Sequence, residues 1–207
     1  TGTSSRVFKV GSRSYTLGVI VQANFGDRSD LMVRGIRVGR MISGLSPKGA
    51  AGGRDGSILA VVATDAPLLG SQLKRVAKRV SLGLARTGSI AHGSSGDIFI
   101  AFSTASPTLD RNGLERWSVL PNDEMDDVFR ATVDATEEAI LNALVAGRDM
   151  RGHGGSTVYG IPRDKLRAIF SKGEELCCCV VSSFLGVQAR ATKRVELLLP
   201  LTRLVVP

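Results

Sequence analysis

A predicted helix between two apolar runs constrains the fold of this chain most strongly. Residues 57–64 form a continuous apolar run, which predicts a strand buried on both faces. Residues 71–85 repeat apolar side chains along one stripe, and Ser71 is the expected N-cap of a helix there. Residues 98–102 predict another buried strand. The chain therefore mixes helices with strands.

The other elements follow from the same periodicities. Residues 123–146 hold the longest helical pattern, and Gly147 is expected to end it. The glycine-rich residues 43–56 predict a flexible surface loop. Further strands are expected at residues 15–23, at 31–38 with a turn at Arg34 and Gly35, and at 177–206, and a short helix at 163–170.

The composition is that of a globular protein. Among 207 residues, 43% are hydrophobic and 22% are charged, which excludes an intrinsically disordered chain. No apolar run reaches the roughly 18 residues of a membrane helix, so no membrane partner is expected. The consecutive cysteines at 177–179 predict buried strand thiols in a reducing cytoplasm, without a disulfide framework or a zinc site. The start at Thr1, which lacks a signal-peptide pattern, predicts that a segment precedes the chain.

The charge leaves two interpretations. Lys and Arg number 27 against 19 Asp and Glu, which gives a net charge of +8. A nucleic-acid-binding module is one interpretation, because four basic residues share a face of the first predicted helix: Lys74, Arg75, Lys78 and Arg79. Aromatic residues make up only 5% of the chain, too few for base stacking. A solvated helix face is therefore favoured, and no nucleic-acid partner is expected.

Residues 88–97 form a loop that is rich in serine and glycine and contains His92 and Asp97. A nucleotide P-loop is disfavoured, because no lysine follows a glycine where phosphates would bind. A nucleophile elbow is disfavoured, because the Gly-x-Ser-x-Gly pattern is missing. A Ser-His-Asp triad with Ser89 and His92 is also disfavoured, because residues so close in one loop rarely align as a triad.

Glu137 stands out in the long helical pattern. It follows Val133 by four residues and precedes Ile140 by three, which places it on the stripe that faces the core. Two interpretations stay open: the carboxylate reaches water at the edge of the stripe, or it points inward as a site residue. Glu138 is expected to be solvated.

Six segments in series resemble one family, the DmpA and BapA group of L-aminopeptidase/D-amino acid esterases and β-peptidyl aminopeptidases. The resemblance runs in order from about residue 1 to 170. The segments are GTSSR at 2–6, GVIVQAN at 18–24, ATDAP at 63–67, GLARTGS at 83–89, GDIFIAFST at 96–104 and ATEEAILNAL at 135–144.

The resemblance implies a self-processing hydrolase with a four-layer α/β/β/α sandwich, similar to ornithine acetyltransferases. Its precursor would cut itself between Gly88 and Ser89. Residues 1–88 would then be the C-terminal part of the larger subunit and residues 89–207 the smaller subunit, together one domain. Residues 173–207 have no counterpart in the family pattern.

By the same resemblance, Ser89 would be the nucleophile, with its own α-amine as the base. Asn24, at the end of a predicted strand, would stabilise the oxyanion. Glu137 would orient the α-amine or the hydroxyl of Ser89, or hold the ammonium group of the substrate. Some family members carry a serine two residues before this glutamate, where this chain has Ala135; Thr136 is the candidate substitute.

The expected activity is removal of N-terminal residues from short peptides, amino acid amides or esters, without a metal or organic cofactor. The expected partners are the missing segment of the larger subunit and further copies of the processed unit in a homo-oligomer. The alternatives are an inactive homologue, an acyltransferase of the same fold, and a hydrolase that uses Thr1 as nucleophile. The sequence does not discriminate among α-, β- and D-amino acid substrates.

Overall fold

The computed structural model describes residues 1–45 and 56–171. Contacts divide the chain into two units, Thr1–Ile169 and Phe170–Pro207, and the sheet with its helices belongs to the first. The predicted strands at 177–206, the cysteines at 177–179 and most of the predicted loop at 43–56 lie outside the described residues. No helix among the described residues has the length and hydropathy needed to cross a bilayer.

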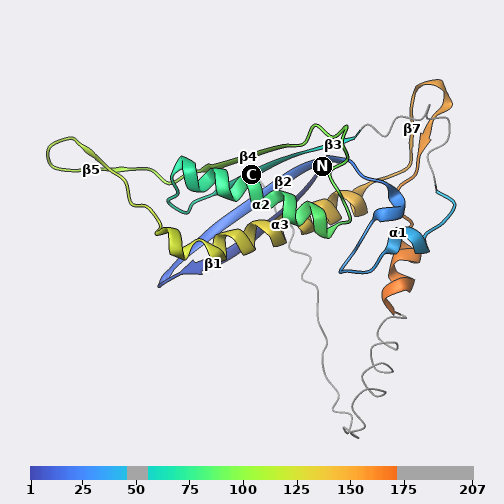
Figure 1. Ribbon diagram of the computed structural model, residues 1–207, viewed down its shortest axis with the longest axis horizontal. Coiled ribbons are helices and arrows are strands. Elements are labelled where there is room, and N and C mark those ends of the chain that lie inside the picture. Colours follow the sequence, from blue (N-terminus) through green and yellow to red (C-terminus); the bar gives the residue numbers. More distant parts are fainter. Residues whose placement is uncertain (46–55, 172–207) are drawn as a thin grey trace, which may run out of the picture. The chain divides into compact units, whose positions relative to one another are not determined.

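Four strands form one sheet, in the order β1-β2-β3-β4 (Figure 1). β1 (Gly2–Val10) and β2 (Arg13–Asn24) are an antiparallel hairpin, and β2 pairs antiparallel with β3 (Ser57–Thr64). β4 (Ile98–Ser103) pairs parallel with β3, because the intervening α2 (Gly70–Arg86) returns the chain to the same edge. The strands predicted at 15–23, 57–64 and 98–102 are confirmed, whereas β1 was not predicted.

Two long helices cover one face of this sheet, as Figure 1 shows. α3 (Asp126–Ala146) packs on β1 and β2, and α2 packs on β4 and on α3. Gly83 permits the close approach of the helices, because a Cβ at this position would overlap Val133 and Thr136 of α3. The core between helices and sheet is built from alternate strand residues, among them Leu17, Val21, Ile58 and Val62.

The opposite face of the sheet is apolar too, yet the described residues leave it exposed. The solvent-exposed fraction is 47% for Ile20, 42% for Leu59 and 44% for Phe102. The prediction that β3 and β4 are buried on both faces is therefore wrong for the described chain, because the helices lie on one side only. The mixed α/β class is confirmed. One helical layer on one sheet is half of an α/β/β/α arrangement.

Several boundaries differ from those predicted. α2 has Leu69 rather than Ser71 as its N-cap, because the Gln72 side chain accepts a hydrogen bond from the Leu69 backbone N–H at 2.9 Å. The predicted start of the second helix at residue 123 falls in a 3-10 turn (Asn122–Glu124), and α3 begins at Asp126. Gly147 ends α3 as predicted.

The segment predicted as extended at 31–38 is mainly irregular. The expected turn at Arg34 and Gly35 is present, since both have positive φ, and it is followed by the short helix α1 (Val38–Met41). The predicted helix at 163–170 is confirmed, with residues 163–171 helical.

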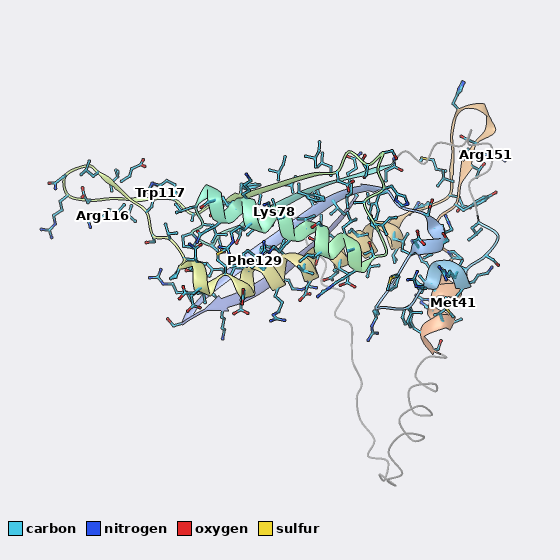
Figure 2. All side chains as sticks on the ribbon, viewed as in Figure 1. Met41, Lys78, Arg116, Trp117, Phe129 and Arg151 are labelled. Atoms are coloured by element: carbon cyan, nitrogen blue, oxygen red, sulfur yellow. The ribbon has the colours of Figure 1, made fainter. Side chains whose placement is uncertain are left out.

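Short elements connect the main ones. Two small hairpins pair β5 (Thr108–Leu109) with β6 (Glu115–Arg116), and β7 (Met150–Arg151) with β8 (Thr157–Val158). Arg116 and Trp117 lie on the first hairpin, away from the helices (Figure 2). Two further 3-10 turns are η1 (Arg28–Asp30) and η3 (His153–Gly155).

Candidate active site

The topology brings three chain segments to one edge of the sheet, which is formed by the end of β2 and by the starts of β3 and β4. β2 ends at Asn24, which is in register with Ser57 at the start of β3. β4 runs parallel to β3 and also starts at this edge, so α2 and the loop after it lead back here. A cavity of about 1010 Å³ opens at this place, and both Asn24 and Ser89 line it. The structure thus brings these two predicted site residues together from positions 65 apart in the chain.

The backbone before Ser89 requires glycine. Gly88 has φ +98°, and a Cβ there would overlap the carbonyl oxygen of Asp30. The preceding Thr87 is buried, and its carbonyl accepts a hydrogen bond from the Met32 N–H at 2.9 Å. Two contacts with residues 30–32 therefore fix the backbone that leads into Ser89.

Ser89 itself is half-buried in the cavity wall. Its Oγ accepts a hydrogen bond from the backbone N–H of Ala91 at 3.1 Å. Ala91 has φ +49°, so the loop turns sharply just after the serine. A second, smaller cavity of about 310 Å³ also has Ser89 in its wall. The hydroxyl is accessible to a small molecule from the larger cavity.

The other polar residues of this loop have separate partners. The Asp97 carboxylate accepts hydrogen bonds from the Ile58 N–H at 3.0 Å and from Ser95 Oγ at 2.5 Å, which ties the loop to β3. His92 lies beside Asp27, with Nε2 3.7 Å from Oδ2. Neither residue is hydrogen-bonded to Ser89 in the described part of the chain, which agrees with the disfavoured Ser-His-Asp triad.

Glu137 lies at the edge of the helix stripe, with 22% of its side chain exposed. Its Oε2 accepts a hydrogen bond from Arg86 Nη1 at 3.2 Å. Arg86 also donates to Asp134 at 2.6 Å, and this bond is the main reason why the pKa of Arg86 is raised. Glu137 is not among the described residues that line the cavity. Its role beside Ser89 stays a prediction.

The neighbours of Glu137 in α3 are buried or hydrogen-bonded. Ala135 and Thr136 are fully buried, and the Thr136 hydroxyl donates to the Thr132 carbonyl at 2.7 Å. This hydroxyl is thus engaged by the helix backbone. Glu138, expected to be solvated, is only half-exposed, because it accepts a hydrogen bond from Ser4 at 2.8 Å and pairs with Arg6. Partial burial opposes its ionisation, but the hydrogen bonds from Ser4 and Arg6 prevail and lower the pKa of Glu138.

Much of the remaining cavity wall is apolar. Arg28 holds one part of this wall in place, because its guanidinium donates a hydrogen bond to the Tyr159 carbonyl at 2.8 Å. This bond joins residues 157–161 to η1. The apolar lining includes Leu31, Ile42, Ile140, Leu144, Val158 and Ile161. A ligand of mixed character fits such a cavity: polar near Ser89 and apolar elsewhere.

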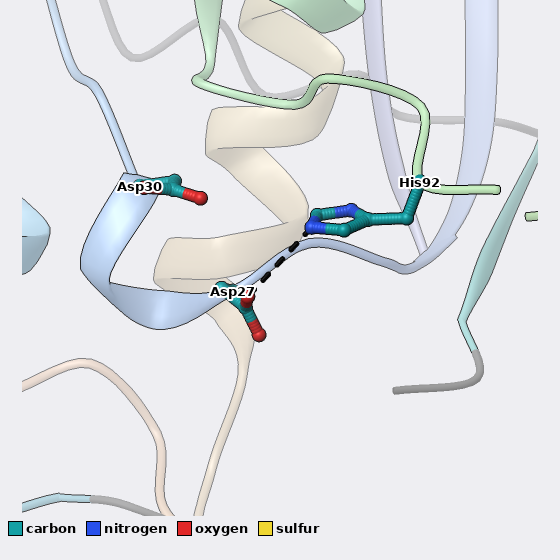
Figure 3. Close-up of side chains that lie close together, drawn as sticks. All are labelled: Asp27, Asp30 and His92. Carbon is teal, nitrogen blue, oxygen red and sulfur yellow. Dashed lines mark ion pairs between the residues drawn. The ribbon is translucent and has the colours of Figure 1, made fainter. Parts of the chain in front are cut away.

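Three further side chains meet beside the cavity. Asp27 and Asp30 are at the two ends of one 3-10 turn, and His92 comes from the loop after Ser89 (Figure 3). Their nitrogen and oxygen atoms lie within 4.8 Å of one another. The sequence does not predict this group, because His92 is 62 residues beyond Asp30 and only the folded chain brings the two loops together. The three-residue spacing of two aspartates was the available signal.

Part of the basic face of α2 has a structural role. The guanidinium groups of Arg75 and Arg79 lie over the Phe129 ring, 5.0 and 3.9 Å from its centre. Lys74 and Lys78 are exposed. Half of this face therefore packs on α3, in the region labelled by Phe129 and Lys78 in Figure 2.

Comparisons with known proteins agree on one family. The model of "Peptidase family S58" matches residues 1–158. The chain is 44% identical over 191 residues to the β-peptidyl aminopeptidase BapA of Sphingosinicella microcystinivorans, covering 85% of this chain and 48% of that protein. The chain thus spans about half the length of the curated relatives it matches.

Solved structures agree with this result. The L-aminopeptidase D-Ala-esterase/amidase of Ochrobactrum anthropi, described as a serine aminopeptidase with a variant Ntn hydrolase fold, superposes with a TM-score of 0.75 at 39% identity. The match covers 84% of this chain and 48% of that one. A Burkholderia sp. β-aminopeptidase gives 0.68 at 37% identity, over 83% of this chain and 48% of that one. The predicted fold class is confirmed, and the described residues share that fold over about half of its length.

Proposed function

Because the chain belongs to peptidase family S58, we propose that it acts as a serine aminopeptidase or amidase, with Ser89 as the nucleophile. One observation carries this proposal: Ser89 follows a glycine held at φ +98° and lines a large cavity together with Asn24. The names of the relatives, a β-peptidyl aminopeptidase and an L-aminopeptidase D-Ala-esterase/amidase, support the same reaction class.

The first proposed step is cleavage of the chain between Gly88 and Ser89. The Ser89 oxygen attacks the Gly88 carbonyl carbon, the peptide C–N bond breaks, and the nitrogen takes a proton to become the α-amine of Ser89. Water then hydrolyses the resulting ester and leaves a carboxylate on Gly88. The positive φ of Gly88 and its contact with Asp30 support this step, because they hold the peptide in a conformation that other residues disfavour.

Catalysis on a substrate uses the new α-amine. Its reference pKa of about 7.7 to 8.0 suits it to accept the proton of the Ser89 hydroxyl near neutral pH. The Ser89 oxygen then attacks the substrate carbonyl, and the amide of Asn24 donates a hydrogen bond to the oxyanion. The leaving amine or alcohol takes the proton, and water releases the acyl group from Ser89.

Glu137 keeps the role that the resemblance implies, which is to orient the Ser89 amine. That role requires its carboxylate to exchange Arg86 for the amine, since Glu137 now accepts a hydrogen bond from Arg86. Thr136 is an unsuitable substitute for the serine of some family members, because its hydroxyl is buried and bonded to Thr132.

We propose short peptides, amino acid amides and esters as substrates. The apolar wall of the cavity suits an apolar amino acid side chain. The proposal also includes assembly of the processed units into a homo-oligomer and a cytoplasmic location. Its supports are the sequence resemblance and the cysteine pattern at 177–179.

Intact-mass measurement together with an aminoacyl p-nitroanilide assay tests the proposal. The wild-type protein should yield fragments that meet at Gly88 and Ser89, and Ser89→Ala should abolish both cleavage and hydrolysis. Thr1 also lines the cavity, so Thr1→Ala is the matched variant and should keep both. Activity that survives Ser89→Ala but not Thr1→Ala would identify Thr1 as the nucleophile instead of Ser89. A protein that never hydrolyses these substrates would be an inactive homologue.

A further inference from the structure

We propose that Asp27, Asp30 and His92 bind a divalent transition-metal ion, of which Zn²⁺ is the expected species. The candidate ligand atoms are one oxygen of each carboxylate and one ring nitrogen, all within 4.8 Å of one another. In Figure 3 the three side chains point toward a common space. Asp27 and His92 line the same cavity as Ser89, but the three ligands have no part in the proposed Ser89 chemistry, and the inference does not depend on it.

The ligand set suits this class of ion. Zn²⁺ binds imidazole nitrogen and carboxylate oxygen at about 2.0–2.2 Å, so the ligand atoms of a tetrahedral site lie about 3.4 Å apart. His92 Nε2 and Asp27 Oδ2 are already 3.7 Å apart. Two carboxylates also balance the charge of a divalent cation, whereas histidine favours Zn²⁺ over Mg²⁺ or Ca²⁺.

Hydrogen bonds fix both segments that carry the ligands: the turn with Asp27 and Asp30, and the loop with His92. The Asp30 N–H donates to the Asp27 carbonyl at 3.0 Å, which closes the turn and sets both side chains on one side of it. The loop that carries His92 is anchored to β3, because the Asp97 carboxylate accepts a hydrogen bond from the Ile58 N–H at 3.0 Å, and this anchor does not depend on the Gly88–Ser89 peptide. The three side chains are half-buried, and we expect rotation about their side-chain bonds to bring the more distant atoms to metal-binding distance.

The cavity supplies access and a free coordination position. Asp27 and His92 line the same cavity of about 1010 Å³ as Ser89, so an ion can enter from solvent and keep a water as fourth ligand. Arg28, between the two aspartates in sequence, donates its guanidinium hydrogen bond to the Tyr159 carbonyl. The nearest cationic side chain in sequence is thus engaged elsewhere.

Calorimetric titration of the purified full chain with Zn²⁺ tests the proposal. Because cysteine thiolates also bind zinc, the titrations use a background in which Cys177, Cys178 and Cys179 are changed to serine. We expect one saturable site per chain. Co²⁺ should occupy the same site and give the visible absorption of a four-coordinate nitrogen and oxygen complex.

Two variants test the ligands, and two others serve as controls. His92→Ala and Asp30→Asn should each weaken Zn²⁺ binding by at least about 100-fold, since even residues that only support ligands are worth 10- to 100-fold. The matched control is His153→Ala, which changes the second of the two histidines and should bind Zn²⁺ like the parent. Ser89→Ala should also retain the parent affinity, so failure of the proposed function leaves this test intact.

Thermal unfolding of each variant without metal shows whether it is folded before titration. The proposal is overturned if the parent shows no saturable one-to-one binding. It is also overturned if a folded His92→Ala variant binds Zn²⁺ as tightly as the His153→Ala control.

Discussion

The core beneath the helices and the sheet edge at Ser89 are built from opposite kinds of residue. The core consists of apolar side chains such as Leu17, Ile58 and Val80, which are almost entirely buried. The edge consists of small and polar residues such as Asn24, Gly88 and Ser89 around an open cavity. Burial of apolar surface stabilises the first region, whereas the second gives up burial for access. The two regions touch at Ile140, which belongs to the core and lines the cavity, but substitutions elsewhere in them should affect mainly stability or mainly chemistry.

Gly88 sets the backbone conformation beside Ser89 at this edge, so its substitution should have the largest effect on the chemistry. Gly88→Ala places a Cβ against the Asp30 carbonyl and forces alanine to φ +98°. We expect complete loss of cleavage at Ser89 and of hydrolysis, measured by intact mass and p-nitroanilide assay. Gly93→Ala is the matched control in the same loop, because a Cβ there meets nothing within 4 Å, and it should mature normally. Normal maturation of Gly88→Ala would contradict the proposed strain.

Asn24→Ala should separate chemistry from stability. Loss of an oxyanion donor lowers kcat by about 10²–10³-fold in known cases, and we expect a decrease of that order with little change in the urea midpoint. Gln22 provides the control, since it is an exposed amide side chain two residues earlier on the same strand. Gln22→Ala should keep the parent kcat. Equal kcat values for the two variants would remove Asn24 from the proposed mechanism.

Two adjacent residues of β3 test the core. Ile58 is 1% exposed and faces the helices, whereas Leu59 is 42% exposed on the opposite face. Ile58→Ala should lower the free energy of unfolding by about 2–5 kcal/mol, and Leu59→Ala by less than about 1 kcal/mol. Urea denaturation of both variants measures the difference. Equal losses would show that the second face of the sheet is covered in the intact protein.

The sequence predicted the local elements better than their surroundings. Residues 57–64 could be recognised as a strand from their apolar run, and α3 from its periodicity, because both signals are local. The exposure of Leu59 could not be predicted, since an apolar run carries no information about which face the helices cover. β1 was missed because residues 3–6 are all polar and Val7 and Phe8 are adjacent, so its sequence lacks the alternation that marks a half-buried strand.

The same distinction applies to the site. Ser89 and Asn24 are candidates through a series of short segments that resemble one family, and both line the same cavity, but their catalytic roles stay predictions. The pairing of Glu137 with Arg86 could not be predicted, because it depends on how α2 and α3 pack around Gly83. The meeting of Asp27 and His92 depends likewise on a contact between two loops.

The smallest expected effect belongs to Glu138, which joins α3 to β1 through Ser4 and Arg6. Its pKa is lowered in the folded protein, so ionisation stabilises the fold at pH values above the unfolded pKa. That contribution is lost as the pH falls through the folded pKa. Because the side chain is 46% exposed, Glu138→Gln should cost only about 0.2–1 kcal/mol at pH 7.

Urea denaturation at several pH values measures this contribution. The difference between wild type and Glu138→Gln should shrink as the solution is made more acidic, since both then carry a neutral side chain. Glu124→Gln is the control, because Glu124 is exposed in the 3-10 turn before α3. A loss for Glu138→Gln that stays constant from neutral to acidic pH would show that packing, rather than charge, joins β1 to α3.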